Sequence, residues 1–237
     1  MAKRSSTATA RRPRQARNGG PRPDFHRQLV LFQWAMSKLG VRDLADFCQR
    51  FQISPDSAEG LDERTGLHRF FEAIAGALPT VGDGQVLPVE RLQEYEHNIL
   101  RHTEAISSAR FRHGQPRVVW KYYQYLALLL TEIFLDHYFS DPERLRDELN
   151  ETIDRHNGRM KAFHRQNGAT TETQWKVDWV NRIETDEGKS AREQLARLAF
   201  WMATGSGKTL LMHMHVRQFR HYHRRAWEAG KWPKLDQ

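Results

Sequence analysis

Apolar residues recur at helical spacing along most of the chain between Phe25 and about Phe163. The first set consists of Leu29, Phe32, Met36 and Leu39. Gly40 interrupts this set, and residues 44–51 resume the same spacing. Because positions three and four apart share one face of a helix, the pattern predicts a pair of amphipathic helices.

Three later stretches carry the same pattern. In residues 65–78 an apolar stripe follows Thr65, a residue that suits a helix N-cap. The next stripe follows Pro88, which suits the first turn of a helix, and a third follows Asp141 and Pro142. Residues 25–163 are therefore expected to form a helical bundle.

The most apolar stretch, residues 118–139, is long enough to raise the question of a membrane span. Charged side chains interrupt it, among them Lys121, Glu132 and Asp136. Charges are costly at mid-bilayer depth, so we expect the central helix of a bundle and no contact with a membrane.

Residues 164–193 differ from the bundle, being polar and rich in Gly and Thr, then acidic. Within them Trp175, Val177 and Trp179 alternate with polar residues, which is typical of an extended segment. We expect a linker over residues 164–193, with a second domain beginning at residue 194.

Composition and charge add an N-terminal arm. The 237 residues are 39% hydrophobic, which fits a folded protein, and their net charge is +8. Residues 1–24 hold seven basic residues and one acidic residue, so six of the eight net positive charges lie there. This segment has almost no large apolar side chains and is expected to be a disordered basic arm. It could screen nucleic-acid phosphates, or be a solvated tail with no specific partner.

The single cysteine, Cys48, cannot form an internal disulfide, which favours a reducing compartment and a cytoplasmic protein.

The sequence "LARLAFWMATGSGKTLLMH" predicts a phosphate-binding loop. The apolar run from Leu195 to Trp201 suits a buried strand, and a helix is expected to begin near Lys208. Gly205 and Gly207 allow backbone amides to converge on an anion at the positive end of that helix. The predicted binding residues are Ala203, Thr204, Gly205, Ser206, Gly207, Lys208 and Thr209. The expected cofactors are ATP and Mg²⁺, with Lys208 reaching the β and γ phosphates and the Thr209 hydroxyl binding the metal ion.

"AFWMATGSGKTLLMH" resembles motif I of superfamily 2 helicases, although Met202 stands where the strict pattern has Gly. It is most similar to the DEAD/DEAH-box-like helicase subunits of type III restriction enzymes. "WKYYQYLALLLTEIFLDHYF" is similar to the helical region that precedes motif I in large proteins of that group. The resemblance implies RecA-like domains, nucleic-acid-stimulated ATP hydrolysis with Lys208 as a catalytic residue, and translocation on double-stranded DNA. It also implies modification or other defence-system subunits as partners.

Hydrolysis in that family also needs a later Asp-Glu pair and arginine fingers, which residues 210–237 do not contain. The expected fold is mainly α, an N-terminal helical bundle followed by the first strand, loop and helix of an incomplete RecA-like domain at residues 194–237. The chain would then be the N-terminal part of a helicase or translocase, with little ATPase activity alone. One alternative is a protein-interaction module from a truncated or frameshifted gene, with a non-functional loop. Another is a nucleotide kinase.

The helix after the loop carries two further candidates. His213, His215, His221 and His223 form two His-x-His pairs. Residues two apart point to nearly opposite sides of a helix, which disfavours metal chelation. Arg217, Arg220, Arg224 and Arg225 give a basic face that could contact nucleic acid or be simply solvated.

Overall fold

The structure, a computed structural model, describes residues 29–78, 86–176, 178–184, 189–199 and 205–234. Over these residues the chain forms nine helices and no β-strand, so it is mainly α as expected. The helices are α1 (Val30–Lys38), α2 (Leu44–Arg50), α3 (Arg69–Ala77), α4 (Val89–Phe111), α5 (Tyr122–Ser140), α6 (Pro142–Gln166), α7 (Glu172–Trp175), α8 (Ala191–Gln194) and α9 (Lys208–Glu228). The predicted basic arm over residues 1–24 lies outside the described residues.

The predicted helical pair is confirmed as α1 and α2. The Asp43 side chain caps α2 by accepting a hydrogen bond from the Asp46 amide at 3.0 Å. The predicted start of the next helix at Thr65 is wrong, because α3 begins at Arg69. Asp62 accepts hydrogen bonds from the Arg64 and Thr65 amides, so this segment forms a turn before the helix starts.

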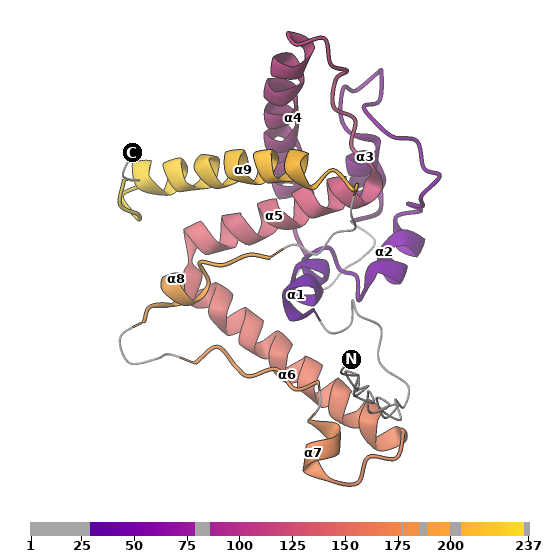
Figure 1. Ribbon diagram of the computed structural model, residues 1–237, viewed down its shortest axis with the longest axis vertical. Coiled ribbons are helices and arrows are strands. Elements are labelled where there is room, and N and C mark those ends of the chain that lie inside the picture. The colour runs from indigo at the N-terminus through magenta and orange to yellow at the C-terminus, as the bar shows by residue number, and fades with distance from the viewer. Residues whose placement is uncertain (1–28, 79–85, 177, 185–188, 200–204, 235–237) are drawn as a thin grey trace, which may run out of the picture.

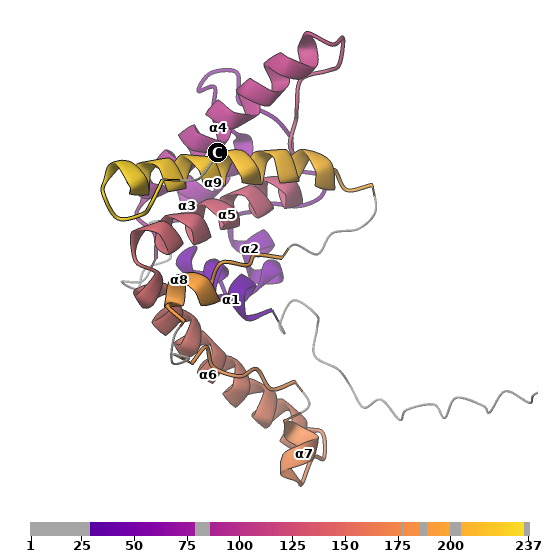
Figure 2. The same ribbon diagram turned by 60° about the vertical axis from the view of Figure 1, so that its left-hand side comes forward.

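The long apolar stretch is confirmed as a central helix. Figures 1 and 2 show α5 among its neighbours, and it contacts α1, α4, α6 and α9. Its ionisable Glu132 is fully buried and is hydrogen-bonded to side chains of α4 and α9. Over the described residues, no helix combines the length and apolar character needed to cross a membrane.

α6 begins as predicted, with Pro142 in its first turn and the Asp141 side chain accepting from the Arg144 amide at 3.0 Å.

Two asparagine side chains of α6 hold the segment of residues 180–183. The backbone of this segment has no strand beside it among the described residues, so its amides and carbonyls bond to these side chains instead. Asn157 accepts a hydrogen bond from the Val180 amide and donates one to the Val180 carbonyl. Asn150 makes the same pair of bonds with Ile183, and all four distances are 2.7–3.0 Å. An extended segment is thus clamped against α6 over residues 180–183.

The strand-like alternation predicted at residues 175–179 is wrong at its first position. Trp175 ends the short helix α7, where the Gln174 side chain accepts from the Thr171 amide at 3.1 Å. Val177 lies outside the described residues. The capping hydrogen bonds within residues 171–175 therefore stabilise a short helix where the alternation of apolar residues predicted an extended segment.

The predicted strand before the loop is not formed over residues 195–199, and residues 200–204 lie outside the described part of the chain. A strand needs a neighbouring strand to pair its backbone, and the described residues supply none. α9 instead packs on α5, and the two helices lie side by side in Figures 1 and 2. The RecA-like unit therefore stays a prediction.

Candidate functional site

The predicted phosphate loop enters α9 through two glycines with left-handed backbones. Gly205 has a φ of 78° and Gly207, the N-cap of α9, has a φ of 84°. L-residues with side chains rarely adopt such angles, so glycine is favoured at both positions. Ala203 and Thr204 lie outside the described residues, while Ser206, Lys208 and Thr209 continue the loop into the helix.

The two residues predicted to bind phosphate and metal open α9. Lys208 and Thr209 are its first two residues, and both are exposed. The amides of Leu210 and Leu211 both donate to the Gly207 carbonyl, at 3.0 and 3.1 Å. The helix N-terminus carries a positive partial charge, so this end of α9 is suited to an anion.

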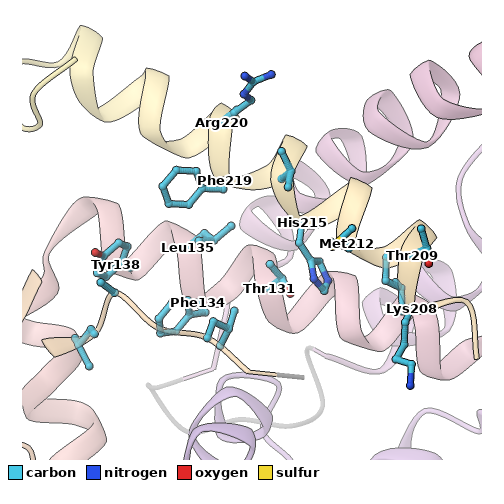
Figure 3. A pocket seen from close by; sticks show the side chains of 15 residues that line it. Thr131, Phe134, Leu135, Tyr138, Lys208, Thr209, Met212, His215, Phe219 and Arg220 are labelled. Carbon is cyan, nitrogen blue, oxygen red and sulfur yellow. The ribbon is translucent and has the colours of Figure 1, made fainter. Parts of the chain in front are cut away.

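A cavity of about 620 Å³ extends from these residues between α9, α5 and the segment around residues 195–198. Figure 3 shows Lys208 and His215 projecting from the same side of α9. The remaining lining is mostly apolar, including Phe134, Leu135 and Met212. Figure 3 shows the Arg220 side chain projecting away from α5, so Lys208 supplies the positive charge on the side of α9 that faces the cavity. One basic group beside an apolar lining suits a negatively charged ligand with an apolar part.

His215 adds no positive charge to this cavity at neutral pH. Burial lowers the pKa of His215 to about 4.

The position of α9 is set by a buried carboxylate on α5. Glu132 accepts hydrogen bonds from Gln218 Nε2 and Tyr222 Oη of α9, each at 2.6 Å, and from Asn98 Nδ2 of α4 at 2.8 Å. Gln218 Nε2 also donates to the Leu128 carbonyl at 3.0 Å. Burial raises the pKa of Glu132 to about 7, although these donors act in the opposite direction.

One residue that touches the loop was missed in the sequence. Gln124, on the first turn of α5, donates from Nε2 to the Ser206 carbonyl at 2.8 Å. Gln124 lies in the apolar stretch of residues 118–139, and no role was predicted for it from the sequence. The available signal was its place three residues after the N-cap Lys121, where Gln often caps a helix. That signal indicates a cap and does not reveal the contact with the loop.

The histidines of α9 differ in their surroundings. His213 is exposed and His223 is buried, while His221 Nδ1 accepts a hydrogen bond of 2.8 Å from Arg101 Nη2 of α4. Among the described residues, no group of three or more His, Cys, Asp or Glu could hold a metal ion. The four arginines predicted to form a basic face are exposed: Arg217, Arg220, Arg224 and Arg225.

The donor set at the loop suits Mg²⁺ delivered with a nucleotide. Thr209 offers an exposed hydroxyl directly after Lys208. Mg²⁺ usually keeps several waters and binds through few protein ligands together with phosphate oxygens. One hydroxyl at this position is therefore compatible with the metal ion predicted from the sequence.

One comparison with known protein families matches the region that contains the loop and α9. The family described as type III restriction enzyme, res subunit, matches residues 159–227, which run from the end of α6 through the loop and nearly all of α9. No curated protein and no solved structure matches the chain. The match supports a helicase-like restriction-enzyme family for these residues.

Proposed function

We propose that this chain binds ATP with Mg²⁺ through the loop of residues 203–209, as part of an ATP-dependent helicase or translocase of restriction-enzyme type. The observation that carries the proposal is the pair of left-handed glycines placed directly before the exposed Lys208 and Thr209 at the start of α9. The res-subunit match over residues 159–227 supports it, because that range contains the described part of the loop.

Each residue has a chemical role in the proposed site. Gly205 and Gly207 allow the backbone to turn toward a phosphate group, and the N-terminus of α9 attracts its negative charge. The Lys208 ammonium contacts the β and γ phosphates, and the Thr209 hydroxyl is a ligand of Mg²⁺. Bound Mg²⁺ supplies charge neutralisation on the phosphates.

Double-stranded DNA is the proposed macromolecular substrate. The exposed arginines of α9, including Arg217 and Arg224, support this assignment because guanidinium groups bind backbone phosphates. Binding through such contacts should weaken steeply as the salt concentration rises. Modification or other defence-system subunits stay predicted partners.

The proposal is tested by calorimetric titration of the full chain with ATP in the presence of Mg²⁺. Lys208→Ala should weaken binding at least about tenfold, since hydrogen bonds to charged groups contribute about 1.5–3 kcal/mol. Thr209→Val removes the hydroxyl at similar volume and should weaken binding of ATP with Mg²⁺ much more than binding of ATP in EDTA. Lys176→Ala, which removes an exposed lysine paired with Glu172 on α7, is the matched control and should bind like the wild type.

Equal affinity of the wild type and Lys208→Ala would reject the proposal. The alternative of a protein-interaction module with a non-functional loop has one observation in its favour. The side chains of Met212 and Val216 are 56% and 51% exposed on α9, an apolar surface that a partner could cover. The two functions are separated by this titration, because an interaction module requires no nucleotide.

A further inference from the structure

Gln124 connects the helical bundle to the phosphate loop across 82 residues of sequence. Its side chain is 8% exposed and makes two hydrogen bonds of opposite kind. Oε1 accepts from the Lys121 amide at 3.0 Å, and Nε2 donates to the Ser206 carbonyl at 2.8 Å. Because the Lys121 amide requires an acceptor, the orientation of the Gln124 amide group is fixed and its NH₂ faces the loop.

The neighbouring glycine leaves the space that this contact needs. A Cβ atom on Gly207 would lie 2.6 Å from Gln124 Nε2, closer than such atoms approach in proteins. Gly207 thus lacks a side chain for two reasons, its positive φ of 84° and the approach of Gln124. The backbone of the loop and the side chain from α5 fit one another.

The same side of α5 holds the rest of α9. Gln124, Leu128 and Glu132 are spaced four apart and lie on one helical face. Their partners run in the same order along the chain, from Ser206 to Gln218 and Tyr222. α5 therefore fixes both the loop and the helix that the loop opens.

From these contacts we infer that Gln124 is a positioning residue for nucleotide binding. It holds the backbone of Ser206 and Gly207 in the conformation that receives phosphate, so the helical bundle determines the affinity of the site. This inference rests on the proposed function, and it adds a role for the bundle that the loop sequence does not contain.

Two substitutions separate the loop contact from the helix cap. Gln124→Glu keeps an acceptor for the Lys121 amide but loses the donor to Ser206, whereas Gln124→Ala loses both. The matched control is Tyr125→Phe on the next residue of α5. It removes a buried hydrogen bond of 2.8 Å to Glu96, on α4, without touching the loop.

The first measurement is the dissociation constant for ATP with Mg²⁺ by calorimetry, alongside the thermal midpoint. Both Gln124 variants should weaken binding about fivefold or more, the effect of one lost hydrogen bond of about 1 kcal/mol. Tyr125→Phe should lower the thermal midpoint and leave the affinity within twofold of the wild type. Gln124 variants that bind within twofold of the wild type, or an equal loss in Tyr125→Phe, would overturn the inference.

The second measurement needs no nucleotide and separates failure of this inference from failure of the proposed function. Amide hydrogen exchange of a peptide covering residues 205–211, whose Leu210 and Leu211 amides donate to the Gly207 carbonyl, should be at least fivefold faster in Gln124→Glu than in the wild type. It should be unchanged in Tyr125→Phe. Equal exchange in all three proteins would show that Gln124 does not hold the loop, whether or not ATP binds.

Discussion

The buried carboxylate of Glu132 gives the protein a pH-dependent stability that one substitution should remove. Burial raises the pKa of Glu132 from its ordinary value of 4.5 to about 7 in the folded chain. The folded state therefore holds this proton more tightly than the unfolded chain does. Stability from the protonated form is fully present below pH 4.5 and is lost as the pH rises through about 7.

The magnitude follows from the difference between the two pKa values. At about 1.4 kcal/mol per pKa unit, the shift corresponds to a total loss of about 3 kcal/mol in the free energy of unfolding. Roughly 2 to 3 kcal/mol of this loss lies between pH 5 and pH 8. Gln at position 132 cannot ionise, so Glu132→Gln should not show this part of the pH dependence.

Urea unfolding of both proteins, followed by circular dichroism at several pH values from 5 to 8, measures the difference. The difference in unfolding free energy between wild type and variant should change by roughly 2 to 3 kcal/mol across this range, with the wild type losing relative stability as the pH rises. Groups that titrate in both proteins cancel in that difference.

Glu148→Gln is the control with the same substitution. Burial would raise the pKa of Glu148, but hydrogen bonds from Lys38 and Trp34 outweigh burial and lower it below 4.5. Its own titration therefore lies below the range of the experiment, and only its charge interaction with His137 can change the difference, so the change from pH 5 to pH 8 should be much smaller than for Glu132→Gln. A Glu132→Gln profile parallel to the wild type would refute the reasoning.

Two further predictions concern the clamp on α6 and the loop glycine. Asn157→Ala removes both hydrogen bonds to Val180 and should cost about 1–3 kcal/mol of stability and speed trypsin cleavage after Arg182, measured by limited proteolysis. Unchanged cleavage would contradict the clamp. Gly207→Ala places a methyl group against Gln124 at a positive φ and should weaken binding of ATP with Mg²⁺ more than tenfold in the same calorimetric titration. Gly230→Ala is its control, because Gly230 has a φ of 71° with open space around it and should show only the cost of the backbone angle.

The sequence by itself located the longer helices and the loop before α9, but not the start of α3 or the short helix α7. The spacing of apolar residues located α1, α5 and α6, and Asp141 with Pro142 marked where α6 begins. Gly205 and Gly207 were predicted to let the backbone turn its amides toward an anion before a helix, and both glycines have a positive φ, while binding of the anion stays a prediction. These features depend on interactions between residues a few positions apart, so a local pattern is enough to predict them.

Only the tertiary structure decided which faces meet. The contact of Gln124 with Ser206, the clamp of Asn157 on Val180 and the bonds of Glu132 to α9 join residues far apart in the chain. Helical periodicity identifies an apolar face but does not specify its partner, and a buried polar side chain acquires its role from the group that it meets. The apolar residues at positions 195–199 predicted a strand, but a strand forms only beside a neighbouring strand. The described residues provide no such neighbour, and the local pattern could not reveal this.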